Sequence, residues 1–180
     1  MSSIKENRQI ALQDSLQQEL LQTPYAKITI DSLCLRTGVH RKTFYRHYAG
    51  KDACLIALLD RRLTEAVCFE KDLEFSSMPN LSGHIAFWVQ QEQLLDALAK
   101  NDLNAIFFER AIHHLVSEDL RSCCDKEYEK YRLQFIASGI LSVLQYWHSN
   151  GRQESPEQLL HKIKCILTTP LGSLLEFVDM

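Results

Sequence analysis

A fifteen-residue stretch near the N-terminus combines side chains that suit contact with a polyanion. It reads GVHRKTFYRHYAGKD over residues 38–52 and gathers histidines, lysines and arginines with two tyrosines and a phenylalanine. Cationic side chains hold phosphates, whereas short polar and aromatic side chains reach base edges or sugars. The composition of this stretch therefore predicts contact with nucleic acid.

The formal charge is unevenly divided along the chain. Residues 1–51 hold eight Lys or Arg against four Asp or Glu, whereas residues 52–180 hold twelve against nineteen, within a net charge of −3. A basic head on an acidic body indicates that only the N-terminal part meets a polyanion. A random scatter of surface charge is the alternative that the count alone leaves open.

Two short helices are predicted to position the basic stretch. Residues 28–38, ITIDSLCLRTG, favour a helix with Thr29 as its N-cap and Gly38 as its stop signal. The following RKTFYRHY favours a second helix, braced on the inside by Leu33, Val39 and Phe44. Such a helix-turn-helix presents one face of its second helix to the major groove. The residues expected on that face are His40, Arg41, Lys42, Thr43, Tyr45 and His47.

The remainder of the chain also follows helical periodicity. Helices are predicted over residues 4–22, 51–73, 84–99, 102–121 and 126–149, and a last one opens at Ser155 with a capping-box pattern. No alternating strand pattern of useful length is present. We predict an all-α chain with a three-helix, helix-turn-helix DNA-binding domain at residues 1–50. A helical effector-binding and dimerisation domain would follow at residues 51–180.

Residues 28–59, ITIDSLCLRTGVHRKTFYRHYAGKDACLIALL, resemble the DNA-binding signature of the TetR family of transcriptional regulators. The resemblance covers roughly residues 5–60 and implies a three-helix head, a long connecting fourth helix and a helical body that dimerises. The matching positions are Ile28, Thr29, Leu33, Gly38, Val39, Thr43, Phe44, Tyr45, His47, Tyr48, Lys51 and Asp52.

The resemblance also implies roles for individual residues of the head. Thr29 would cap the second helix and touch phosphate, and Lys51, opening the fourth helix, would meet phosphate. The chain departs from the family pattern at Asp31, Cys34 and Gly50, and Asp31 would weaken a phosphate contact from its position. Contacts to bases or to the DNA backbone are implied for His40, Arg41, Lys42, Thr43, Tyr45 and His47.

Residues 131–163 resemble the C-terminal region of a TetR subgroup with small bodies, related to the dihydroxyacetone-kinase activator. We therefore expect a homodimer in which the helices over 127–149 and 156–168 form a four-helix bundle with their mates. The small residues Ala137, Ser138 and Gly139 would allow close approach there, although packing within one chain is an equal alternative.

Aromatic residues of the body are candidates for an effector pocket. Gln91 or His113 would add polar selectivity to an otherwise apolar lining. Ordinary core packing would also explain why these residues are aromatic. The rival hypothesis is a body without a cavity, regulated by a protein partner. The lining candidates are Phe87, Trp88, Phe107, Phe108, Tyr131 and Phe135.

The sequence offers little for catalysis or for metal binding. No nucleophile elbow, P-loop, zinc-protease or dinucleotide motif is present, so we expect no catalytic residue and no cofactor. Adjacent His113 and His114 point about 100° apart on a helix, which disfavours a shared metal with Glu109 or Glu118. The six cysteines show no zinc spacing and are predicted to be packing residues, with a redox pair at Cys123 and Cys124 as the alternative.

Together these features predict a homodimeric, DNA-binding transcriptional regulator, with repression the commoner mode in the family. The N-terminus lacks the apolar segment of a secretory signal, and no apolar run approaches the roughly 20 residues of a membrane span, so a cytoplasmic location is expected. A TetR-like coactivator or adaptor controlled by a protein partner is the alternative.

Overall fold

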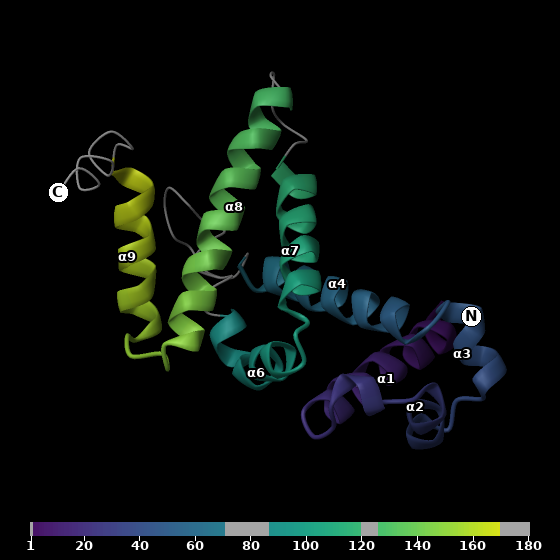
Figure 1. Cartoon of the computed structure of the whole chain (residues 1–180). Helices are drawn as coiled ribbons and strands as arrows, with labels where there is room; N and C mark the ends of the chain where they lie inside the picture. The colour runs from purple at the N-terminus through teal and green to yellow at the C-terminus, as the bar shows by residue number, and fades with distance from the viewer. Residues whose placement is uncertain (1, 71–86, 120–125, 170–180) are drawn as a thin grey trace.

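The computed structural model describes residues 2–70, 87–119 and 126–169, and within these ranges all regular structure is helical (Figure 1). This confirms the predicted all-α class. None of these helices combines the length and apolar character that a membrane crossing requires. The elements are α1 Ser2–Leu20, the short 3₁₀ helix η1 Tyr25–Lys27, α2 Ile30–Thr37, α3 Arg41–His47, α4 Lys51–Glu70, α6 Glu92–Lys100, α7 Asn104–Asp119, α8 Lys126–Ser149 and α9 Pro156–Thr168.

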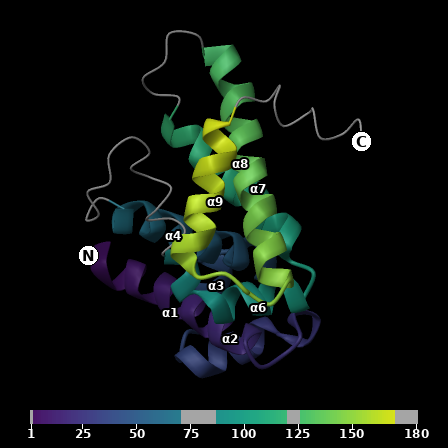
Figure 2. The same cartoon turned by 90° about the vertical axis from the view of Figure 1, so that its left-hand side faces the viewer.

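The molecule has a head and a body joined by α4 (Figure 1). We use head for residues 2–47, which include α1 to α3, and body for residues 87–169, which include α6 to α9. Helix α4 packs against α1 in the head and against α7 in the body. In the body, α8 packs against α7 on one side and α9 on the other (Figure 1). The view turned by 90° looks at the body from the side of α9 (Figure 2).

One continuous apolar core runs from the head into the body. In the head it contains Leu12, Leu16 and Phe44, none of which is exposed to solvent. Helix α4 extends this core through a row of buried leucines, because apolar residues recur at helical spacing along it. Head and body are therefore packed as one solid unit along α4. The α4 members of the core are Cys54, Leu55, Leu59, Leu63 and Ala66.

A second, smaller core joins α8 and α9 around Trp147, Leu159 and Ile163. The indole Nε1 of Trp147 donates to the carbonyl of Glu154 at 3.0 Å, which holds the connection between the two helices. The predicted capping box at Ser155 is confirmed, since its side chain accepts from the amide of Gln158 and its amide donates to the Gln158 side chain.

The predicted helix over residues 84–99 is interrupted in the structure at Gln91. Residues 87–90 are helical, Gln91 has φ −96° and ψ 26°, and α6 begins at Glu92. On an unbroken helix Trp88 and Ala97, nine residues apart, would point in opposite directions, because each residue turns the helix by about 100°. Both are buried, so the break at Gln91 allows one core to receive both. The prediction of a single helix was wrong for this reason.

The cysteines are not all packing residues. Cys34 and Cys54 are buried as predicted, and burial raises the pKa of the Cys54 thiol to about 12, so this thiol stays protonated at neutral pH. Cys165 is exposed on α9, and the prediction is wrong there. Cys68, Cys123 and Cys124 lie outside the residues whose side chains are described, and with them the proposed redox pair.

Candidate DNA-binding surface and effector pocket

Helix α2 begins at a capping box. The Thr29 hydroxyl accepts from the Ser32 amide at 3.1 Å, and the Ser32 hydroxyl accepts in return from the Thr29 amide at 3.3 Å. The Ser32 hydroxyl also donates to the Glu19 carboxylate at 2.7 Å, which ties the start of α2 to α1. The predicted N-cap role of Thr29 is therefore confirmed by geometry, while its contact with phosphate stays a prediction.

A left-handed glycine makes the turn between α2 and α3. Gly38 has φ +67°, a conformation that residues with a Cβ adopt only with strain. Val39 then enters the core, and His40 caps α3 by accepting, through Nδ1, from the Lys42 amide at 3.4 Å. The turn therefore sets where the recognition helix begins.

Phe44 anchors α3 and so decides which of its faces points outward. Its side chain has no solvent exposure and packs in edge or tilted contacts with the rings of Tyr45 and Tyr48. Tyr48 receives a hydrogen bond from Gln13 of α1 at 2.9 Å. Because one face of α3 is held inward in this way, the opposite face is left to solvent.

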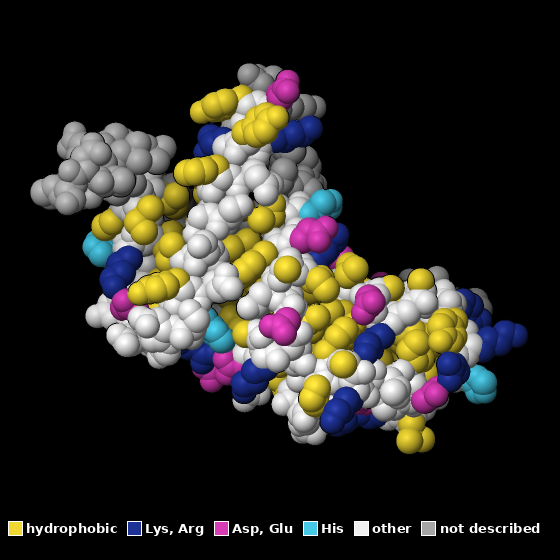
Figure 3. All heavy atoms as spheres, in the orientation of Figure 1, with side chains coloured by type: hydrophobic (Ala, Val, Ile, Leu, Met, Phe, Trp, Pro, Cys, Tyr) yellow, Lys and Arg dark blue, Asp and Glu magenta, His cyan; other side chains and the backbone are white. Residues whose placement is uncertain are grey.

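The outward face of α3 is basic and aromatic, as the sequence predicts. His40, Arg41, Lys42 and Tyr45 are exposed, whereas Thr43 and His47 are half-buried. Lys and Arg side chains gather at the end of the molecule where α3 lies (Figure 3). The candidate residues between positions 40 and 47 therefore share one end of the head, although not all of them are equally accessible.

Two of the α3 side chains are held by neighbours. The Thr43 hydroxyl accepts from Arg46 Nη2 at 3.1 Å. Arg41 Nη1 donates to both carboxylate oxygens of Asp31 at 2.7 and 2.8 Å, and its guanidinium carbon lies 5.7 Å from the centre of the Tyr45 ring. From the sequence, Asp31 was predicted only to depart from the family pattern, and its pairing with Arg41 was not predicted.

Lys51 lies at the start of α4 and is engaged within the head. Its ammonium donates to the backbone carbonyls of Tyr25 and Ile28, at 2.5 and 2.8 Å, and lies 4.2 Å from the centre of the Tyr25 ring. An ammonium carries three donors, of which two are used here, and the contact of Lys51 with phosphate stays a prediction. Bracing of the loop before α2 is a role that sequence analysis did not foresee.

Tyr25 joins the head to the body. Its amide donates to Asn101 Oδ1 at 2.6 Å, and the Asn101 amide group donates in turn to the carbonyl of Ala97 in α6. Its hydroxyl donates to Asp52 of α4 at 2.6 Å. Burial, followed by the bond to Asp52, raises the pKa of the Tyr25 phenol, so the hydroxyl remains a neutral donor. The loop before the recognition unit is thus attached to both α4 and α6.

Charged side chains make further links between elements. Arg110 of α7 binds both carboxylate oxygens of Asp60 in α4, at 2.8 and 2.9 Å. Arg152, just after α8, pairs with Glu92 and Asp96 of α6 at 2.7 and 2.9 Å. The first contact therefore joins α4 to α7, and the second joins the end of α8 to α6.

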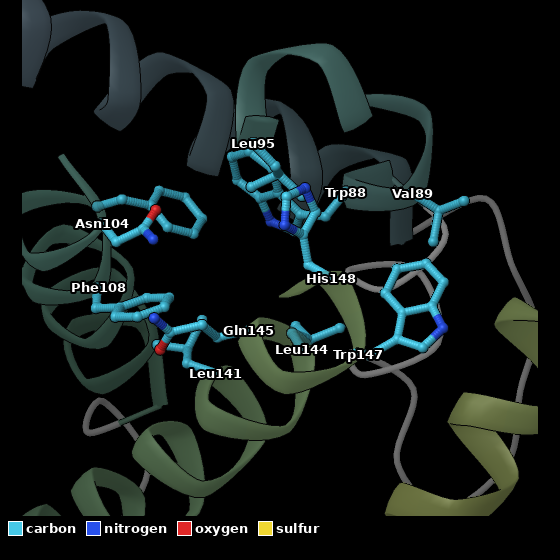
Figure 4. Close-up of a pocket in the computed structure, with 11 residues that line it drawn as sticks. Trp88, Val89, Leu95, Asn104, Phe108, Leu141, Leu144, Gln145, Trp147 and His148 are labelled. Atoms are coloured by element: carbon cyan, nitrogen blue, oxygen red, sulfur yellow. The ribbon is translucent and has the colours of Figure 1, made fainter. Parts of the chain in front are cut away.

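A small pocket opens between α6, α7 and α8 (Figure 4). Its cavity volume is about 50 Å³, and its lining is mostly apolar, with Asn104, Gln145 and His148 as polar members. About 10–15 Å³ of such volume holds one water molecule, so the pocket has room for only a few. The apolar members are Trp88, Val89, Leu95, Phe107, Phe108, Leu141, Leu144 and Trp147.

The structure brings only some of the predicted effector residues to this pocket. Trp88, Phe107 and Phe108 line it, as predicted. Phe87 is buried beside Trp88 and Gln91 lies at the start of α6, and neither lines the pocket. The α8 residues Leu141, Gln145 and His148 were missed, although their helical spacing places them on one face.

Three other predicted effector residues lie on the surface. His113 is exposed on α7, and Tyr131 and Phe135 are exposed on α8, with exposed fractions of 73% and 67% for the last two. None of the three lines the pocket, and Tyr131 and Phe135 lie on the face of α8 opposite to the one that packs on α7. Across the described residues, no group of three or more His, Cys, Asp or Glu side chains is arranged to hold a metal ion.

Comparisons with known proteins agree with this architecture. A TetR family model, described as transcriptional regulator C-terminal region, matches residues 93–169. The HTH-type transcriptional regulator EthR of Mycobacterium tuberculosis and that of Mycobacterium bovis are 34% identical over 61 residues, which is 34% of this chain. The chain spans 28% of the length of these curated relatives.

A solved structure extends the comparison to most of the chain. The TetR transcriptional regulator from Streptococcus agalactiae 2603V superposes with a TM-score of 0.65 at 22% identity, over 90% of this chain and 94% of that one. The helix-turn-helix head and the helical body define a DNA-binding class of transcriptional regulator. Within that class, the chain is similar to TetR family regulators over residues 93–169, over a 61-residue stretch shared with EthR, and in its overall fold.

Proposed function

We propose that this regulator binds a near-palindromic operator as a homodimer and represses transcription. The observation that carries the proposal is the outward face of α3, where exposed basic and aromatic side chains lie over a buried Phe44. Phosphate contacts come from cationic side chains and from Thr29 and Lys51, and base contacts come from the first turn of α3. The acidic body stays away from the duplex.

Binding is tested with DNA from around the regulator's own gene. A mobility-shift assay with wild-type protein is expected to give a specific, salt-sensitive complex, and Tyr45→Ala is expected to weaken it while leaving the fold intact. A folded Tyr45→Ala protein with undiminished operator affinity would show that α3 is not the recognition helix. A wild-type protein that ignores all such DNA would favour an interaction or adaptor role.

The dimer is proposed to form through α8 and α9. One face of α8 carries an aromatic stripe, consisting of Tyr128, Tyr131, Phe135 and Tyr146, whose exposed fractions lie between 66% and 73%. Hydrophobic side chains project along α8 in the space-filling view (Figure 3). Exposed apolar side chains in a row are typical of a protein–protein interface. Ile166, 48% exposed on α9, is a further candidate for it.

We propose that a small, largely apolar effector controls operator binding from the pocket between α6, α7 and α8. Trp88, Phe107 and Phe108 support an aromatic or aliphatic ligand, and Asn104, Gln145 or His148 supplies its polar contact. Because the pocket is small, ligand binding would have to widen it and so displace α6. A metabolite library screened by thermal shift tests this, with ligand-dependent operator release as the expected result.

Control by a protein partner is the second candidate, as in a TetR-like coactivator or adaptor. The small volume of the pocket, about 50 Å³, is the observation that favours this candidate. Under this hypothesis no library compound raises the melting temperature, and a purified partner changes DNA binding instead. The two candidates therefore predict different results in the same pair of assays.

A further inference from the structure

Arg41 is the most constrained cation on the outward face of α3. Its Nη1 donates to both oxygens of Asp31, which lies in the first turn of α2. Its Nη2 lies 3.5 Å from the Tyr45 hydroxyl, and its guanidinium lies beside the Tyr45 ring. Two different elements therefore fix the orientation of one guanidinium at the start of the recognition helix.

Fold stability does not account for the pairing of Asp31 with Arg41. The two side chains are 68% and 55% exposed, and ion pairs between exposed side chains contribute little in water. A carboxylate on a surface that faces phosphates also opposes binding through charge repulsion. A carboxylate in the first turn of α2 also suits the helix dipole, but that effect does not depend on Arg41. The pairing with Arg41 itself therefore points to a role in recognition.

The free part of the guanidinium offers such an explanation. With Nη1 directed to Asp31 and one Nη2 hydrogen directed to the Tyr45 hydroxyl, the second Nη2 hydrogen and the Nε hydrogen remain for a ligand. Arginine reads guanine through two donors that meet O6 and N7 in the major groove, and this contact needs a fixed guanidinium plane. A guanidinium fixed in advance also loses less freedom on binding.

We propose that Asp31 is a positioning residue that determines specificity, because it aims Arg41 at a guanine and keeps it from neighbouring phosphates. This rests on the proposed DNA-binding function of α3. Without Asp31, the guanidinium of Arg41 would bind any nearby phosphate. With Asp31, Arg41 distinguishes between base pairs. Asp31 thereby lowers non-specific affinity and raises discrimination.

The test compares four full-length proteins: wild type, Asp31→Ala, Arg41→Ala and the double variant. Binding-site selection from randomised duplexes first defines the preferred operator of the wild type. Each operator base pair is then substituted singly, and affinities are measured at one fixed salt concentration. Arg41→Ala is expected to lose about 5- to 150-fold discrimination at one base pair in each half-site.

Asp31→Ala is expected to lose discrimination at the same base pair and, unlike Arg41→Ala, to bind random DNA more tightly. The double variant should discriminate no worse at that position than Arg41→Ala alone, because the two residues act through one contact. A purely structural role of Asp31 would lower affinity for all sequences together. Asp31→Glu, which retains the carboxylate, is expected to restore part of the preference.

A charge-matched control separates positioning from general electrostatics. Glu109→Ala removes one negative charge from the exposed surface of α7 in the body and should leave the base preference unchanged. The proposal is overturned if Asp31→Ala keeps full discrimination at the base pair that Arg41→Ala no longer reads. It is also overturned if Asp31→Ala changes a different base pair, since Asp31 would then read that base itself. A wild-type protein without any preferred duplex would contradict the DNA-binding function as well.

Discussion

At the scale of single residues, adjacent side chains of α3 have different roles. Phe44 is fully buried, whereas the adjacent Tyr45 is 48% exposed, so one side chain holds α3 in place and the next is free to meet DNA. The same contrast separates residues that stabilise the head from residues that we propose to contact the operator. Substitutions at the two positions should therefore have different consequences.

Phe44→Ala is expected to lower the free energy of unfolding by about 3–5 kcal/mol, because it removes a large buried side chain and leaves a cavity. Tyr45→Ala should cost far less stability and mainly weaken operator binding. Chemical denaturation and fluorescence anisotropy with labelled operator measure the two effects. Equal loss of stability in both variants would contradict the assigned inward and outward faces.

Lys51→Met keeps the aliphatic stem of Lys51 but removes its ammonium. We expect a loss of about 1–3 kcal/mol in stability, since the carbonyls of Tyr25 and Ile28 lose a charged donor. Operator and random DNA should both bind more weakly, with the slope of log affinity against log salt reduced by about one per protomer. An unchanged slope would show that Lys51 only braces the head.

At the scale of elements, α8 has two faces with different tasks. Its inner face packs on α7 and lines the pocket, and its outer face carries the aromatic stripe. Gly139 lies on the outer side, and a Cβ added there would meet no atom within 4 Å, so the protomer itself has room for a larger residue. Any penalty for such a residue must then come from a partner.

Gly139→Arg is therefore expected to give folded monomers rather than misfolded protein. Light scattering measures the mass, and circular dichroism measures the helix content. Ala105→Arg is the matched control, because it places the same side chain on the exposed surface of α7, outside the stripe. A Gly139→Arg protein that remains a dimer, with native helix content, would exclude this face of α8 from the interface.

At the scale of the whole molecule, head and body are joined by a continuous core and by polar contacts at its edge. The Tyr25 amide bound to Asn101 is the contact that links the loop before α2 directly to the α6–α7 connection. Asn104, which lines the pocket, follows three residues later. A displacement of α6 would therefore reach the head through Asn101.

Asn101→Ala is expected to raise the hydrogen-exchange rate of the Tyr25 amide by about fivefold, which corresponds to one hydrogen bond of about 1 kcal/mol. Exchange in α9 should not change, because α9 is distant from this contact. The variant should also respond less to any ligand that releases the operator from wild-type protein. Unchanged exchange at Tyr25 would show that the bond to Asn101 does not hold the loop.

The amino-acid sequence by itself determined the local features of this protein. Helical periodicity, the Thr29 N-cap, the Ser155 capping box, Gly38 and the inward Phe44 could all be predicted, because each depends on residues within about a turn of one another. The helix-turn-helix and its basic face followed from the same short-range patterns. The resemblance to the TetR family followed as well, since the signature of that family is a continuous stretch of the head.

Only the tertiary structure decided features that depend on contacts between distant residues. The break at Gln91 arises because Trp88 and Ala97 must enter one core, and no local helix-breaking residue marks it. Tyr131 and Phe135 are surface residues and not pocket residues, because the opposite face of α8 meets α7. The ion pair of Asp31 with Arg41 joins residues 10 positions apart. The hydrogen bond of Tyr25 to Asn101 joins residues 76 positions apart. Periodicity describes which face of an element is apolar, whereas packing decides which partner that face meets.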